Sequence, residues 1–87
     1  MNFRKNLSSP ISKFKMYQRV KYIPLHANGD INHEDCSIGF VNSTNELYVF
    51  VKFAKQLALF NWNGTTSQAC DPLDLIILSG HWPKDTF

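Results

Sequence analysis

The stretch GFVNSTNELYVFVKF, residues 39–53, carries the strongest periodic signal in the chain. Apolar residues recur in it at every second position: Leu47, Val49, Val51 and Phe53. This spacing is typical of one face of a β-strand. The polar, turn-favouring residues 42–46 separate this strand from a shorter β-prone run at residues 38–41. We therefore predict a β-hairpin in which the Leu47/Val49/Val51/Phe53 face is buried.

The opposite face of this strand carries Tyr48, Phe50 and Lys52. Two aromatic rings make that face too apolar to be simply solvated. We expect another part of the chain to cover it, or a partner to bind it. Among the aromatic residues of the chain, we expect three to be mostly buried: Tyr22, Phe50 and Phe53.

Length and composition bound the class of protein. A chain of 87 residues forms one small domain, which can spare little apolar surface for a deep catalytic cleft. With 44% hydrophobic residues, it is apolar enough to fold alone. No run approaches the ~20 apolar residues of a membrane span, and the N-terminus lacks the apolar centre of a signal peptide. We therefore expect a cytoplasmic protein without a membrane partner.

The net charge of +2 conceals an asymmetry. Residues 1–15 contain four Lys and Arg and no acid, whereas residues 16–87 contain five Lys and Arg against seven Asp and Glu. The cationic charge therefore belongs to an N-terminal arm, and the remainder is mildly acidic. The two cysteines, Cys36 and Cys70, are expected to stay free thiols in a reducing cytoplasm.

Further strands and turns follow from local signals. Residues 17–24 (YQRVKYIP) predict a first strand that ends at Pro24, because proline has no N–H to donate. A long polar loop at residues 25–35 comes next, and long loops on small β domains often carry function. We leave residues 54–62 open as strand or helix, and predict a two-residue turn at Asn63-Gly64 followed by a strand at residues 65–70. Residues 71–75 predict a 3₁₀ turn capped by Asp71, and residues 76–78 predict the last strand.

Together these elements predict an all-β fold. Five short strands, with a 3₁₀ turn before the last, describe a small five-stranded SH3-like barrel over residues 17–78. A basic N-terminal arm, residues 1–16, precedes it, and a C-terminal tail, residues 79–87, follows it with Trp82 and Phe87 available to dock. The alternative is an OB-fold, which carries a helix between its third and fourth strands.

Two segments resemble a group of short proteins encoded by tailed phages and prophages of Gram-negative bacteria: VKYIPLHANGDINHEDCSIGFVNSTNELYVFVKF and QACDPLDLIIL. The pattern is a V-x-Y-x-P strand, an H-A-N-G-D loop, H-x-D-C, a glycine-started hairpin and a closing P-x-D-L. The resemblance covers residues 17–78. It implies a phage gene and an SH3-like barrel, and because the function of the group is uncharacterised it implies no catalytic residues. Where such proteins tend to carry an acid after the V-F-V-K-F strand, this chain has Ala54.

The loop contains a mixed set of side chains that zinc accepts: His26, Asp30, His33, Asp35 and Cys36. The closely spaced cysteine or histidine pairs that anchor structural zinc are missing, so we predict no metal and no cofactor. We expect the loop to be held by side-chain to backbone hydrogen bonds instead, with Asn28 and Asp30 in Asx-turns and the histidines capping carbonyls. The chain also lacks a convincing nucleophile–base pair and a glycine-rich phosphate loop, so we predict that it is not an enzyme.

We therefore predict a non-catalytic protein-binding module, encoded by a phage and inhibiting a host defence factor by occupying its site. An acidic loop and an aromatic face suit a basic, apolar partner. The residues predicted to bind this partner are His26, Asn28, Asp30, His33, Glu34, Asp35, Tyr48 and Trp62. The alternative is a nucleic-acid-binding accessory protein that uses its aromatic face together with Arg4, Lys5, Lys13, Lys15, Arg19 and Lys21. An exposed edge strand would equally support a homodimer.

Overall fold

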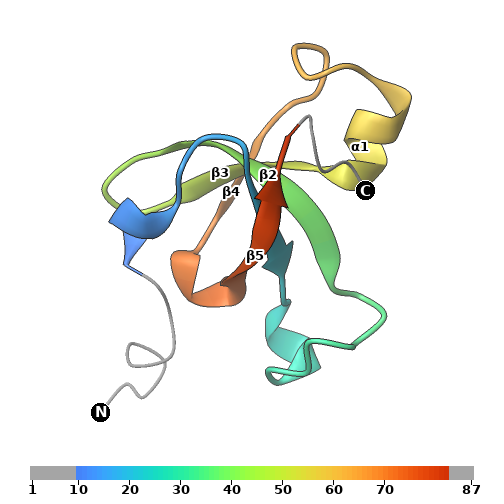
Figure 1. Cartoon of the computed structure of the whole chain (residues 1–87). Helices are drawn as coiled ribbons and strands as arrows, with labels where there is room; N and C mark the ends of the chain where they lie inside the picture. Colours follow the sequence, from blue (N-terminus) through green and yellow to red (C-terminus); the bar gives the residue numbers. More distant parts are fainter. Residues whose placement is uncertain (1–9, 83–87) are drawn as a thin grey trace.

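The computed structural model describes residues 10–82, which form one five-stranded antiparallel sheet (Figure 1). The strands are β1 (Gln18–Tyr22), β2 (Ser37–Thr44), β3 (Val49–Phe53), β4 (Gln68–Cys70) and β5 (Leu75–His81), in the order β4-β3-β2-β1-β5. The other elements of this part are the helix α1 (Ala54–Leu59) and the 3₁₀ turns η2 (Ile11–Lys13), η3 (Leu25–Ala27) and η4 (Pro72–Asp74). The predicted all-β class, with a 3₁₀ turn before the last strand, is confirmed. Closure of the sheet into a barrel stays a prediction.

The predicted hairpin is formed by β2 and β3, but its turn lies further along the chain than expected. Asn45 Oδ1 accepts hydrogen bonds from the backbone N–H groups of Leu47, at 2.9 Å, and Tyr48, at 2.8 Å. These bonds fold residues 45–48 into the turn and leave Leu47 69% exposed. The predicted burial is therefore wrong for Leu47, while Val49 and Val51 are fully buried and Phe53 is half-buried.

One face of the sheet holds the main hydrophobic core. Its buried members come from all five strands and from the segment before β1: Phe14, Val20, Val41, Val49, Val51, Cys70 and Leu75. Ile11, Tyr22, Phe53 and Ile77 pack against them. Phe14 belongs to the arm predicted at residues 1–16, so part of that segment contributes to the core. Tyr22, Phe50 and Phe53 are mostly but not fully buried, as predicted.

The chain itself covers the part of the other hairpin face that carries Phe40 and Lys52, whereas Tyr48 stays exposed. Four rings form an aromatic cluster there: Tyr17, Phe40, Trp62 and Trp82. Trp62 stacks on Trp82 at 5.8 Å between ring centroids, and Tyr17 and Phe40 contact this pair at 4.9 and 5.7 Å respectively. The backbone N–H of Trp82 also donates to the carbonyl of Tyr17 at 2.8 Å. Trp82 thus docks as expected, while Phe87 lies outside the described residues.

Lys52 ties β3 to the aromatic cluster. Its side chain is buried, Nζ donates to the carbonyl oxygen of Trp62 at 2.6 Å, and Nζ lies 4.7 Å from the centroid of the Trp62 ring. The strand therefore buries its lysine by giving the ammonium group both a carbonyl and a ring face.

Replacing Lys52 by methionine, which keeps the apolar stem, should lower the free energy of unfolding by about 1 kcal/mol, because the bond to Trp62 is lost. Urea unfolding monitored by tryptophan fluorescence measures this change. Lys55→Met, at an exposed position of α1, is the matched control and should change stability by less than about 0.5 kcal/mol. An equal effect of both variants would contradict the role given to Lys52.

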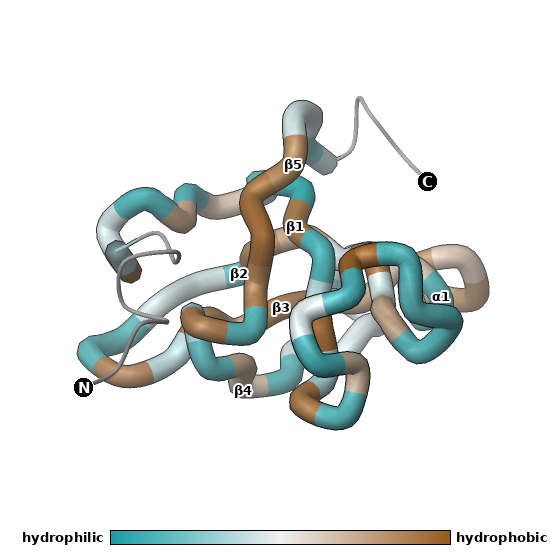
Figure 2. Tube along the Cα trace, turned by 90° about the horizontal axis from the view of Figure 1, so that it is seen from below, coloured by the Kyte–Doolittle hydropathy of each residue, from teal (hydrophilic) through white to brown (hydrophobic). Residues whose placement is uncertain are grey.

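The region between β3 and β5 differs in part from the sequence predictions. Residues 54–59 are helical, and the turn after them begins at Asn61, whose Oδ1 accepts from the Gly64 N–H at 2.7 Å. Asn63-Gly64 is therefore not a two-residue hairpin turn, and β4 is shorter than predicted because it begins at Gln68. η4 is confirmed, with Asp71 Oδ1 accepting from Leu73 N–H at 2.9 Å. β5 continues to His81, and Figure 2 shows its apolar first half.

Candidate functional site

The candidate site is the loop of residues 25–36, called the 25–36 loop below, which joins β1 to β2 at one end of the sheet (Figure 1). η4 lies beside the base of this loop, because the Ile23 N–H donates to the carbonyl of Asp74 at 2.8 Å. The first strand therefore brings two separate polar segments, the 25–36 loop and η4, to the same end of the molecule.

Turn residues shape the first half of the loop. η3 ends at Ala27. Its C-cap, Asn28, adopts the left-handed conformation with φ of 53°, and Gly29 follows with φ of 82°. Asparagine and glycine tolerate this region of backbone space better than other residues do. Asn28 thus acts through its backbone conformation as a C-cap rather than through the predicted Asx-turn. The Asx-turn of Asp30 is confirmed, since Asp30 Oδ1 accepts from the Asn32 N–H at 2.9 Å.

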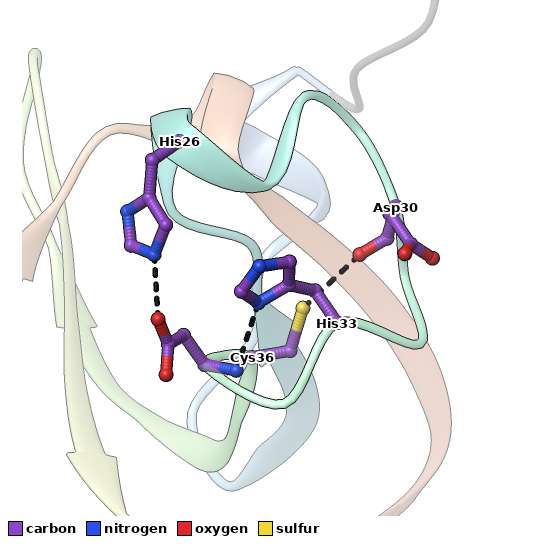
Figure 3. A network of polar contacts seen from close by, with 5 residues as sticks. His26, Asp30, His33 and Cys36 are labelled. Carbon is purple, nitrogen blue, oxygen red and sulfur yellow. Dashed lines mark hydrogen bonds and ion pairs between the residues drawn. The ribbon is translucent and has the colours of Figure 1, made fainter.

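A network of polar contacts holds the second half of the loop (Figure 3). His26 Nε2 lies 2.7 Å from Asp35 Oδ2, and the Asp35 backbone N–H donates to His33 Nδ1 at 3.0 Å. The Cys36 thiol donates to the carbonyl of Asp30 at 3.3 Å. The histidine side chains therefore bind Asp35. The prediction that they cap backbone carbonyls is wrong. The shape of the loop follows from contacts among its own residues.

The contact with His26 also favours the charged form of Asp35. The hydrogen bond to His26 lowers the pKa of Asp35, and the positive potential of His26, His33 and Lys55 acts in the same direction. A carboxyl whose folded pKa is lowered stabilises the fold at pH values above its unfolded pKa. This contribution is lost as the pH falls through the lowered value. At neutral pH the loop therefore presents an ionised Asp35.

Acidic groups gather at this end of the sheet. Five of the seven acidic residues of the chain lie in the 25–36 loop or in and beside η4: Asp30, Glu34, Asp35, Asp71 and Asp74. Of the other two, Glu46 lies in the hairpin turn at the far end of β2, and Asp85 lies outside the described residues. The three acids of the loop are all exposed. This end of the molecule is therefore negatively charged and accessible.

Two large apolar side chains accompany these charges. Leu25 is 68% exposed and Ile31 is 46% exposed, and both belong to the 25–36 loop. Sequence reasoning missed them, because an isolated apolar residue in a polar loop is usually expected to turn into the core. The sequence feature that could have indicated their exposure is their position among turn-forming residues. There, local hydrogen bonds determine the backbone path, and the side chains need not pack into the core.

Six of the eight predicted partner-binding residues lie in the 25–36 loop, and two do not. Tyr48 is exposed in the hairpin turn at the opposite end of β2. Trp62 is half-buried in the aromatic cluster, where it contacts Tyr17, Trp82 and Lys52. The structure therefore does not bring these two side chains into one surface with the loop.

The predicted cationic residues occupy other places. Lys13 and Lys15 are exposed before the start of β1, and Arg19 and Lys21 are half-buried on the face of β1 opposite to Val20. Arg4 and Lys5 lie outside the described residues. The start of β1 is the end of the strand remote from the 25–36 loop. Lys13 and Lys15 therefore lie apart from the acidic loop.

The two cysteines are free thiols, as predicted. Burial raises the pKa of Cys70 to about 11, with the negative charge of Asp74 adding to the effect. Cys70 therefore remains protonated at neutral pH, which leaves it a poor nucleophile and a poor metal ligand. The His26, His33 and Asp35 side chains of the loop, by contrast, lie close enough together to hold a metal ion.

No protein-family model, curated protein or solved structure significantly matches this chain. Within residues 10–82, no helix combines the length and apolar character needed to cross a membrane.

Proposed function

We propose that this protein is a non-catalytic binding module that docks its 25–36 loop onto a basic, partly apolar patch of another protein. The observation that supports this most is the combination of three exposed acids with two exposed apolar side chains on a loop that holds its own shape. Charged and apolar groups in one small area form a surface of the kind that protein interfaces use.

The internal bonds of the loop favour binding because they reduce its entropic cost. The contacts of Asp30 with Asn32, and of His26 with Asp35, restrict the loop before a partner arrives. A preorganised loop loses less conformational freedom on docking than a flexible one. Leu25 and Ile31 then supply apolar burial, while the carboxylates steer the partner and select its charge.

The resemblance to phage-encoded proteins suggests the kind of partner. A host nuclease or another nucleic-acid-binding defence enzyme presents a basic surface that the acidic loop would occupy. Inhibition would then be steric and electrostatic, with the loop taking the place of the phosphate backbone. No chemical step by this chain is needed.

The sharpest test compares two exposed glutamates. Glu34 lies in the 25–36 loop and Glu46 in the remote hairpin turn, and neither side chain forms a hydrogen bond with another described residue. We expect Glu34→Lys to weaken partner binding about tenfold, because it places a cation against a basic patch, and Glu46→Lys to change it less than about twofold. The partner is first captured on the immobilised full chain from a nuclease-treated Gram-negative bacterial lysate, and its affinity is then measured by titration.

A second pair of variants separates the contribution of the charges to binding from that of the apolar side chains. The triple variant Asp30→Asn, Glu34→Gln, Asp35→Asn keeps side-chain acceptors but removes three charges, whereas the double variant Leu25→Ala, Ile31→Ala keeps the charges. Both should bind more weakly than the wild type. Unchanged partner affinity in both variants would contradict the proposal that the loop forms the interface. An equal loss of affinity in the Glu34→Lys and Glu46→Lys proteins would also contradict it.

Nucleic-acid binding remains the second candidate because Lys13 and Lys15 are exposed, remote from the acidic loop. A gel shift with single- and double-stranded DNA and RNA across a salt series tests it, with Lys13→Gln, Lys15→Gln as the variant. Under our proposal, any shift is weak, independent of sequence and abolished by moderate salt. A sequence-specific shift that survives salt and is lost in the double variant would favour the alternative.

A further inference from the structure

Three potential metal ligands of the 25–36 loop converge on one point. His26 comes from η3, and His33 and Asp35 come from the segment that returns to β2, so the loop brings them together across its width (Figure 3). One ligand atom from each residue lies within 4.8 Å of the others. The imidazole rings meet edge to face at 5.3 Å between centroids.

We propose that His26, His33 and Asp35 form an exchangeable site for a divalent transition-metal ion of the zinc type. Two imidazole nitrogens and one carboxylate oxygen make a donor set that such an ion accepts, and solvent completes the coordination. His26 and Asp35 have side chains that are 62% and 55% exposed, so an ion reaches them directly from solvent.

The distances require only small side-chain movements. Zinc lies about 2.0–2.2 Å from such ligands, which places two tetrahedral ligand atoms about 3.3 Å apart. His26 Nε2 and Asp35 Oδ2, now 2.7 Å apart, would open slightly as the ion takes the place of the hydrogen bond, and the longer separations would close. The exposed side chains of His26 and Asp35 can make most of these changes without a change of fold, while His33 is half-buried.

Binding also has an identifiable cost. His33 Nδ1 accepts the Asp35 N–H, so ligation through His33 Nε2 requires the ring proton to move to Nδ1 and this hydrogen bond to break. Because the bond lies at the exposed surface, water can replace the lost partner. Hydrogen bonds among its own residues hold the loop, and the ligand side chains must rearrange to bind a metal ion. The site is therefore exchangeable rather than structural, and this inference is independent of the proposed partner.

The test is calorimetric titration of the chelator-treated full chain with Zn²⁺ alone. We expect one saturable site whose affinity falls by about tenfold or more in His26→Gln and in His33→Gln. His81→Gln, at the remaining histidine of the chain, and Cys36→Ser are the controls and should bind as the wild type does. Chelation should leave the melting temperature unchanged, and excess Zn²⁺ should raise it.

Backbone NMR spectra guard against misfolding, because a folded variant keeps the resonances of the sheet. In the wild type, Zn²⁺ should shift resonances of residues 26–36 selectively. Absence of saturable binding would overturn the proposal. So would binding that survives in both histidine variants or that is lost in Cys36→Ser or His81→Gln.

Discussion

Phe40→Ala is expected to lower the free energy of unfolding by about 3–5 kcal/mol, the largest single effect in the described part of the chain. Phe40 is completely buried on β2, on the face away from the main core, and its ring meets Trp82 edge to face. Truncation leaves a ring-sized cavity between the sheet and the aromatic cluster. It also removes the contact that helps to fix the end of β5.

Urea unfolding monitored by tryptophan fluorescence measures this effect, since both tryptophans belong to the aromatic cluster. Phe60→Ala is the matched control, because the Phe60 side chain is 53% exposed and its loss should cost less than about 1 kcal/mol. Phe40→Leu, which retains most of the apolar volume, should fall between the two. Equal losses for Phe40→Ala and Phe60→Ala would contradict the packing described for this face.

Gly39→Val should cost about 3 kcal/mol for a different reason, which is overpacking. A Cβ atom at Gly39 would lie 2.4 Å from Val51 Cγ1 and 3.1 Å from the backbone oxygen of Lys52. Strand β3 cannot give way easily, because it pairs with both β2 and β4. The glycine that opens the predicted hairpin is therefore required by close packing within the sheet.

The same substitution at Gly64 provides the control. A Cβ atom there would meet Asn61 Oδ1 at 3.1 Å, which is the end of a side chain at an exposed turn, so Gly64→Val should cost less than about 1 kcal/mol. Thermal and urea unfolding of both variants give the comparison. A Gly39→Val protein as stable as the wild type would show that β2 and β3 do not approach each other as described.

The sequence predicts the sheet better than its turns. The alternation at Val49 and Val51 identifies β3 because a half-buried strand repeats every two residues. It fails at Leu47, because the side chain of Asn45 binds two backbone N–H groups and takes Leu47 out of the strand. Local side-chain bonds of this kind cannot be read from hydrophobic periodicity.

The candidate site is predicted in the same uneven way. Charge alone identifies Asp30, Glu34 and Asp35, since carboxylates in a long polar loop remain exposed. The pairing of His26 with Asp35 depends on the path of the loop, which neighbouring residues in the sequence do not specify. Trp62 joins the aromatic cluster because α1 and β5 bring residues 62 and 82 together. Such long-range contacts depend on the tertiary structure.

The most direct test of the central claim is amide hydrogen exchange of the full chain, measured with and without the captured partner protein. The binding proposal predicts that the partner slows exchange in residues 25–36, with little change in the hairpin turn at residues 45–48. Slowed exchange confined to the hairpin turn, or to the exposed edge of β4, with residues 25–36 unchanged, would contradict it.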